Sequence, residues 1–386
     1  MLNNQNGEPI QNNFLNNKNN LQNNEENNDN IQYKFSRYTK PIKTGLINFG
    51  DTSYFNAVLF SLGNIRDLSS YFLNPKNQNI INQNISEMPF SYAYERLLIH
   101  FYPFNEKDEE LKYDPSSIFK LLGEHNIVYK SFKRRNPNDL LCFILNKLHS
   151  ELKVQKSKPK LNGKITDKNQ IIKYGFENFK NFNDSIISKI FNWFEIKETI
   201  CNKCSQSIYD FQTFNTFSLD IYSTYQYQKN KDDDLEYLTI YDCLDFFGFG
   251  KQNNLYCNNC KKSLNKIHTS RIFSSPEIFI FLIERGVDFD KNNTLINIPF
   301  HLYDKIDLFN FVDNSEVPQK YGLIGVVSIY MKYKKYVSFC MSPVNNQWYF
   351  YNDENIEQTD ISSVLQKHNN YKEFIPSILF YESINI

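Results

Sequence analysis

The spacing of apolar positions changes about halfway along the chain. In the first half they recur every three or four residues, which predicts amphipathic helices over residues 54–61, 90–102, 115–124 and 137–152. After about residue 195 the apolar residues come in short runs rich in β-branched and aromatic side chains. These runs predict strands over residues 211–222, 277–285, 294–300, 321–330 and 335–342. Helices followed by strands predict an α+β fold.

Two segments lack this patterning. Residues 1–37 form an Asn-rich tail, and such a tail buries too little apolar surface to offset the entropy lost on ordering. We therefore expect the tail to be disordered and the folded domain to occupy residues 38–386. The stretch 153–173 is polar and rich in lysine, and we expect a solvated insertion there.

Length and charge narrow the class of protein. A chain of 386 residues allows one large domain or two to three smaller ones. Its 43 basic and 43 acidic residues cancel, which argues against nucleic acid or a membrane surface as the main partner. It has neither an apolar run of about 18 residues nor a leader in which charged residues precede an apolar stretch. We therefore expect an intracellular protein of the cytoplasm or nucleus, with no membrane and no nucleic acid among its partners.

Four of the seven cysteines stand in two C-x-x-C pairs, Cys201 with Cys204 and Cys257 with Cys260. Inside the cell this spacing indicates a metal site rather than disulfides. Four thiolates satisfy tetrahedral Zn²⁺ completely, which predicts a closed, structural zinc site. The alternatives are two hairpin turns with buried thiols, or a redox pair, although neither pair has the βαβ surroundings of a thioredoxin-like site. The other cysteines, at positions 142, 243 and 340, lie in apolar contexts that predict core positions.

Residues 45–62 carry the most specific motif, GLINFGDTSYFNAVLFSL. It resembles the nucleophile box of the ubiquitin-specific proteases, Gly-Leu-x-Asn-x-Gly-Asn-Thr-Cys-Tyr-x-Asn-x-x-Leu-x-x-Leu. The residues that fit are Gly45, Leu46, Asn48, Gly50, Thr52, Tyr54, Asn56, Leu59 and Leu62. The resemblance puts Ser53 at the position of the nucleophilic cysteine and Asn48 at that of the oxyanion-hole residue. An alternative role for Asn48 is that of a polar turn residue that holds the loop.

A second region resembles the base box of the same family. That box reads Tyr-x-Leu-x-Ala-Val-x-x-His, then Gly-His-Tyr-x-x-Tyr, then Trp-Tyr-x-Phe-Asp-Asp-x-x-Val. The matching residues are Tyr321, Leu323, Val326, Val327, Tyr336, Trp348, Tyr349, Tyr351, Asn352, Asp353 and Ile356. The match implies that Lys335 takes the position of the general base and Asn352 that of the residue that orients it. None of the six histidines lies in this box.

The resemblance extends over about residues 40–385. It implies a papain-like ubiquitin-specific protease fold with a helical thumb (about 45–190), zinc-ribbon fingers (about 195–270) and a β-rich palm (about 270–386). It also implies ubiquitin or a ubiquitin-like protein as partner, and room for a larger protein complex. The departures concentrate at catalytic positions, as in the inactive members of the family. They are Asp51, Ser53, Lys335 and the segment Arg134–Pro137, where the family has Gln-Gln-Asp-Ala.

Three functions are compatible with these departures. A Cys-His pair needs an ionisable thiol and a base with a pKa near the working pH, whereas an ordinary lysine, with a pKa of about 10.4, is protonated at pH 7. The favoured interpretation is a pseudoenzyme that binds ubiquitin or a ubiquitin-like protein without cleaving it. The first alternative is an active deubiquitinase that uses Ser53, since Ser-Lys dyads work on other folds when the lysine is desolvated. The second is an interaction scaffold that no longer binds ubiquitin.

Overall fold

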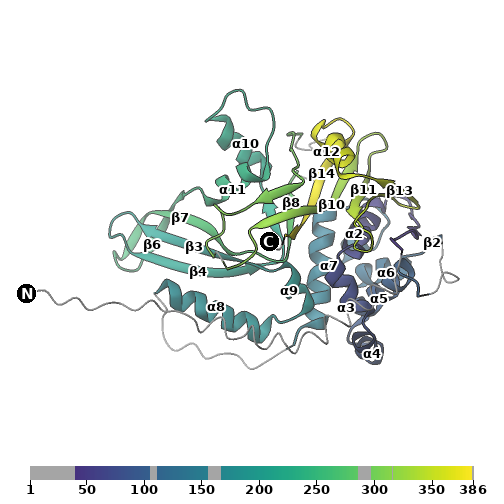
Figure 1. Ribbon diagram of the computed structural model, residues 1–386. Helices are drawn as coiled ribbons and strands as arrows, with labels where there is room; N and C mark the ends of the chain where they lie inside the picture. Colours follow the sequence, from purple (N-terminus) through teal and green to yellow (C-terminus); the bar gives the residue numbers. More distant parts are fainter. Residues whose placement is uncertain (1–39, 105–110, 155–166, 286–296, 315, 385–386) are drawn as a thin grey trace, which may run out of the picture.

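The computed structural model describes residues 40–104, 111–154, 167–285, 297–314 and 316–384. Figure 1 shows a group of helices at one end, a large β-sheet in the middle and a narrower β-sheet that reaches away from both. The expected Asn-rich tail lies outside the described residues. None of the described helices is both long enough and apolar enough to cross a bilayer.

The helical part lies in the region expected to form the thumb. Its helices are α2 (Ser53–Gly63), α3 (Arg66–Leu73), α4 (Pro75–Gln83), α5 (Pro89–Phe101), α6 (Ser116–His125), α7 (Pro137–Leu152) and α9 (Ile186–Phe191), with a short 3-10 helix at Ile127–Tyr129. The four helices predicted from spacing correspond to α2, α5, α6 and α7, within two residues at each end. Two short strands, β1 (Gly45–Leu46) before α2 and β2 (Lys112–Tyr113) after α5, form a parallel pair.

The segment that departs from the Gln-Gln-Asp-Ala box starts α7. The side chain of Asn136 accepts a hydrogen bond from the backbone N–H of Asn138, and Pro137 takes the first helical position. Asparagine before a helix and proline at its first residue both favour this start, because they satisfy or remove N–H groups that have no partner inside the helix. The altered residues therefore still support a well-capped helix.

The central sheet has eight strands. Seven follow one another across it in the order β13 (Asn355–Thr359), β12 (Trp348–Asn352), β11 (Lys335–Met341), β10 (Lys320–Tyr330), β14 (Phe374–Ser383), β8 (Ile278–Ile283) and β5 (Phe217–Leu219), while β9 (Lys305–Asp307) pairs with β10. Every pair is antiparallel except the parallel pair β5 and β8. The strands predicted at 277–285, 321–330 and 335–342 are confirmed as β8, β10 and β11.

Both faces of the central sheet are buried. Val327 of β10 belongs to the core shared with the thumb helices, whereas its neighbour Val326 belongs to the core on the opposite face. This alternation follows from the two-residue period of a strand. The opposite face is covered in part by α11 (Ile240–Gly248), which contributes Leu244 to that core. Helix α10 (Ile221–Lys229) packs against α11, and α12 (Ile361–Asn369) lies between β13 and β14 in sequence.

A second, antiparallel sheet extends away from the palm, in the order β4 (Ser207–Phe214), β3 (Trp193–Cys201), β7 (Lys262–Ser274) and β6 (Lys251–Cys257). Helix α8 (Lys168–Phe182) runs along this sheet in Figure 1. The ring of Phe176 on α8 contacts the rings of Phe194, Phe211 and Phe273 on three of the strands. These aromatic contacts fix α8 to the sheet.

The end of the stretch 153–173, expected to be a solvated insertion, is mostly exposed at residues 167–173 but is helical. Residues 155–166 lie outside the described part of the chain, but α8 begins at Lys168. The side chain of Asp167 starts this helix by accepting from the backbone N–H of Gln170. The rings that pack α8 against the sheet come after residue 173, so the lysine-rich stretch alone gave no sign of a packed helix.

Two expected strands also need correction. Residues 297–300 of the expected strand 294–300 form only a single bridge, between Phe300 and Leu238. Pro299 lacks the N–H that a regular ladder requires. The run 211–222 is divided, because β4 ends at Phe214, β5 joins the other sheet, and Asp220 caps α10 by accepting from the backbone N–H of Ser223.

Candidate active site and metal centre

Ser53 is the first residue of α2 and is buried, with 2 % of its surface exposed. Its Oγ accepts a hydrogen bond of 3.1 Å from the backbone N–H of Tyr336. Tyr336 lies on β11, which packs directly against α2, so the palm holds the serine in place. The first turn of α2 contains no acidic residue. Because the N-terminus of a helix carries a partial positive charge, it favours negative charge at residue 53.

The loop before α2 is folded around the side chain of Asn48. Its Oδ1 accepts from the backbone N–H of Gly50 at 3.0 Å and from the backbone N–H and hydroxyl of Thr52 at 3.2 and 3.0 Å. Thr52 Oγ1 in turn accepts from the backbone N–H of Phe49. Gly50 has a φ of +117°, which a side chain would strain. The oxygen of Asn48 thus determines the shape of this loop.

The carboxylate of Asp353 joins this loop to α2 and to the palm. Its Oδ2 accepts from Asn48 Nδ2 at 2.9 Å and from Lys335 Nζ at 3.2 Å. Its Oδ1 accepts from Asn56 Nδ2 at 2.9 Å. Asp353 is buried in the turn between β12 and β13, and three donors satisfy its charge there, as a buried carboxylate requires. The Nδ2 group of Asn48 is thereby directed at Asp353.

Lys335 is the first residue of β11, and 26 % of its side chain is exposed. Its Nζ forms an ion pair with Asp353 and makes no hydrogen bond to Asn352, whose buried Oδ1 has no partner within the described ranges. A general base must offer a lone pair to the proton it removes. The Nζ of Lys335 is instead engaged by the Asp353 carboxylate, at 3.2 Å.

All six histidines lie in the described ranges, and no hydrogen bond there joins one of them to Ser53. The most buried, His368 on α12, has Nε2 2.6 Å from Ser328 Oγ and Nδ1 2.7 Å from the carbonyl oxygen of Val364. Burial lowers the pKa of His368 to about 4. Because both members of this Ser-His pair have no exposed surface, it is sealed from any substrate.

The same loop is tied to the thumb on its other side. Arg134 Nη2 lies 3.2 Å from Asp51 Oδ1, and the rings of Phe49 and Phe132 lie 5.3 Å apart. Asp51 and Arg134 both depart from the family pattern, and they meet in space. Two departures that are far apart in sequence therefore form one contact beside Ser53.

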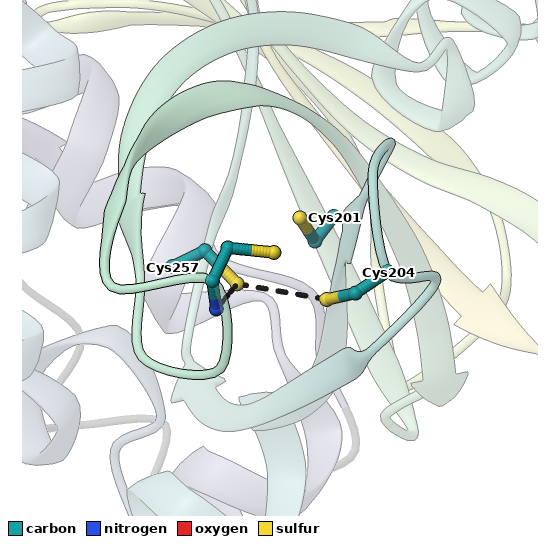
Figure 2. A group of neighbouring side chains, drawn as sticks. Cys201, Cys204 and Cys257 are labelled. Atoms are coloured by element: carbon teal, nitrogen blue, oxygen red, sulfur yellow. Dashed lines mark hydrogen bonds between the residues drawn. The ribbon is translucent and has the colours of Figure 1, made fainter.

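The four cysteines of the two C-x-x-C pairs come together at the far end of the second sheet, where all four Sγ atoms lie within 4.8 Å of one another. Figure 2 shows the sulfurs of Cys201, Cys204 and Cys257 facing one another, with Cys204 Sγ 3.7 Å from Cys257 Sγ. Each pair occupies a turn, and the residue after each pair, Ser205 or Lys261, has a positive φ. The predicted structural zinc site is confirmed as a four-cysteine cluster that fits Zn²⁺.

Hydrogen bonds at the cluster shift the pKa values of two of its thiols in opposite directions. A hydrogen bond from the Asn259 side chain lowers the pKa of Cys204 to about 6, and the hydrogen bond to Cys204 raises the pKa of Cys260 to about 12. Cys204 therefore gives up its proton more readily than Cys260. Zinc binding replaces those protons, because the ligands of zinc are thiolates.

A family model described as ubiquitin carboxyl-terminal hydrolase matches residues 44–381. The chain belongs to this family. Ubiquitin carboxyl-terminal hydrolase 2 of Bos taurus is 23% identical over 334 residues, which cover 83% of this chain and 53% of that protein. Ubiquitin carboxyl-terminal hydrolase 15 of Xenopus tropicalis is 27% identical over 228 residues, covering 53% of this chain and 22% of that protein. The chain thus spans about half the length of the first relative and about a fifth of the second.

Solved structures of the hydrolase family share the fold. Ubp8 in a SAGA DUB module with Sgf11, Sus1 and Sgf73, bound to monoubiquitin, superposes with a TM-score of 0.64 at 18% identity, covering 91% of this chain and 70% of that chain. The same module bound to ubiquitin aldehyde gives a TM-score of 0.63 at 18% identity, covering 89% and 70%. The predicted α+β ubiquitin-specific protease fold is confirmed.

Within this hydrolase frame, Asp353 is the residue that sequence reasoning did not select. The family pattern has two adjacent acidic positions, filled here by Asn352 and Asp353, and spacing alone does not show which side chain faces the site. Asn352 pairs with Asn355 to close the β12–β13 hairpin, while Asp353 has a φ of +55° in the turn. The turn geometry brings the Asp353 carboxylate to Asn48 and Lys335.

Proposed function

We propose that this member of the hydrolase family binds ubiquitin or a ubiquitin-like protein without hydrolysing it. The observation that carries the proposal is the ion pair between Lys335 and Asp353 beside a serine at the nucleophile position. The family frame around these residues is retained, including the zinc centre and the match over residues 44–381. A retained family fold with altered residues at the nucleophile and base positions favours binding of a ubiquitin-like protein over its hydrolysis.

The chemistry of acyl transfer supports this proposal. A serine hydroxyl becomes a useful nucleophile only when a neighbouring base takes its proton. Ser53 Oγ accepts a hydrogen bond from a backbone N–H, and the amine at the base position is paired with a carboxylate. Asn48 Nδ2, at the oxyanion-hole position, also donates to that carboxylate. Nucleophile, base and oxyanion donor are therefore all engaged in structural contacts.

Solved relatives support the choice of partner. The two structures of the Ubp8 module contain monoubiquitin or ubiquitin aldehyde, together with Sgf11, Sus1 and Sgf73. We propose a ubiquitin-like ligand for this chain by analogy of fold, together with a place in a larger protein complex inside the cell, in the cytoplasm or nucleus. The roles of Ser53, Lys335, Asn352 and Asn48 as former catalytic positions belong to the same proposal.

The test separates binding from chemistry. The zinc-loaded full chain is titrated with ubiquitin by calorimetry, and is incubated separately with ubiquitin that carries a C-terminal electrophile. We expect a dissociation constant on the order of 1–100 µM and no covalent adduct. Ser53→Ala should bind ubiquitin like the unmodified chain. A covalent adduct at any residue would contradict the proposed absence of reactivity. No binding at ubiquitin concentrations several times the upper expected dissociation constant would contradict the proposed binding of ubiquitin.

The two alternatives predict different results in the same experiments. Hydrolysis of a fluorogenic ubiquitin amide that Ser53→Ala abolishes would establish an active deubiquitinase. Absence of ubiquitin binding, combined with a pull-down partner that excess ubiquitin does not displace, would establish a scaffold. A flat progress curve together with measurable ubiquitin binding supports the proposed function.

A further inference from the structure

Two short segments beside Ser53 carry a concentrated positive charge. The thumb basic segment, residues 130–135, reads KSFKRR, and the hairpin basic segment, residues 331–336, reads MKYKKY. Neither contains an acidic residue, and together they hold seven basic ones, namely Lys130, Lys133, Arg134, Arg135, Lys332, Lys334 and Lys335. The whole chain has a net charge of zero, so this excess is a local feature rather than a general one.

The fold brings these two segments to opposite sides of one loop. Arg134 of the thumb basic segment contacts Asp51, and Tyr336 of the hairpin basic segment donates its backbone N–H to Ser53. Asp51 and Ser53 are two residues apart at the N-terminus of α2. Burial raises the pKa of the Tyr336 hydroxyl, and the charge of Arg134 opposes that rise, so the guanidinium lies within electrostatic range of this tyrosine. The two segments therefore form one basic surface across the start of α2.

Carboxylates neutralise only part of this surface. Asp51 pairs with Arg134, and Asp353 pairs with Lys335. Within the described ranges no ion pair includes the other five basic residues, Lys130, Lys133, Arg135, Lys332 and Lys334. Two further carboxylates lie at the outer ends of the surface. The charge of Asp139 raises the pKa of Tyr129, near Arg135, and the charge of Glu373 raises the pKa of Lys332. The unpaired basic residues therefore lie on either side of the helix N-terminus, where Asp51 and Asp353 neutralise Arg134 and Lys335.

We propose that this basic surface binds an acidic polypeptide segment across the N-terminus of α2. The N-terminus of the helix and the flanking lysines favour the same sign of charge in a ligand. Exposed apolar side chains on both segments, Phe132 and Tyr333, add contacts of the kind that a peptide provides. The positive charge is confined to two short segments of a chain with no net charge, which favours a polypeptide over nucleic acid as the ligand. This inference does not depend on ubiquitin recognition.

The test uses the zinc-loaded full chain and a fluorescein-labelled peptide of alternating Glu and Gly, with a Gln-Gly peptide as the neutral match. Binding is followed by fluorescence anisotropy at low and high salt. The double variant Lys133→Glu/Lys334→Glu changes one exposed lysine in each segment. The matched control, Lys76→Glu/Lys305→Glu, makes the same change of charge at exposed positions on α4 and β9. Thermal unfolding verifies that both variants fold.

We expect the acidic peptide to bind more tightly than the neutral one, with affinity that falls as salt rises. The segment variant should weaken this binding by about ten-fold or more, and the control variant should change it by less than about two-fold. Equal affinity for both peptides, or equal losses in the two variants, would overturn the proposal. Tighter binding of a single-stranded oligonucleotide that depends on the same lysines would overturn the assignment to a polypeptide. Ubiquitin titrated against the same variants reports on the proposed function separately.

Discussion

Ser53 accepts a hydrogen bond from Tyr336, the neighbour of Lys335 on β11, so substitutions at Ser53 and Lys335 are expected to act together. Ser53→Cys introduces a thiol at a helix N-terminus but leaves Lys335 paired with Asp353. We therefore expect Ser53→Cys to remain nearly inactive on a fluorogenic ubiquitin amide. Ser53→Cys/Lys335→His adds an imidazole, and positioned acid-base groups contribute about 10²-fold or more, so the double variant should hydrolyse the substrate faster by about that factor.

The matched control for this prediction is Ser53→Ala/Lys335→His, which supplies the base without a nucleophile and should show no hydrolysis. Restoration of hydrolysis by Ser53→Cys alone would mean that another group acts as the base. At the residue scale, the sequence predicted which positions are altered but not how they are engaged. Asp353 differs from Asn352 only by one position in the same motif, and a turn with positive φ decides which side chain reaches Lys335.

Helix α12 is attached to the palm by a polar contact whose strength depends on pH. His368 on α12 is buried with Ser328 on β10, and burial lowers its pKa to about 4. In the unfolded chain a histidine has a pKa of about 6.5, so the unfolded state takes up the proton first as pH falls. The stability that the neutral imidazole contributes is thus complete above pH 6.5 and is lost between about pH 6.5 and 4. Over this pH range the free energy of unfolding should fall by about 3 kcal/mol because of His368.

Urea unfolding at pH 7 and pH 5 measures this effect. His368→Gln should lower the free energy of unfolding at pH 7 but show a smaller further loss at pH 5 than the unmodified chain. The control, His125→Gln, alters an exposed histidine and should keep the full pH dependence. The same loss between pH 7 and pH 5 in His368→Gln and in the unmodified chain would assign the pH dependence to other groups.

At the scale of elements, periodic patterning predicted α2, α5, α6 and α7 but not the shorter helices α3 and α11. It failed for α8, because the Phe176 contacts that hold this helix involve strands that follow it in sequence. It failed also at residue 220, where an aspartate cap converts an apparent strand into the start of α10. Contacts between distant segments and local capping are both weakly encoded in the spacing of apolar residues.

At the scale of the whole molecule, the thumb and the palm share a hydrophobic core, whereas the end of the second sheet depends on zinc. Residues of α2 and of β10 belong to one buried cluster, so these two parts should unfold together. Cys201 and Cys257 are buried but lie outside both large clusters. Structural zinc contributes about 10–16 kcal/mol of apparent binding free energy in zinc-finger peptides. Removal of zinc should therefore destabilise the end of the second sheet locally and leave the thumb and the palm folded.

Hydrogen exchange with and without a strong chelator tests this division. Chelation should speed exchange in β6 and in the turns at 201–206 and 257–261, while α2, β10 and β14 keep their protection. Cys204→Ser should reproduce the chelator effect, because it removes one of four ligands from the cluster. Cys142→Ser, at a cysteine of the thumb outside that cluster, should not reproduce it. Faster exchange in α2 and β10 after chelation would instead mean that zinc supports the common core, and that thumb, palm and fingers form one cooperative unit.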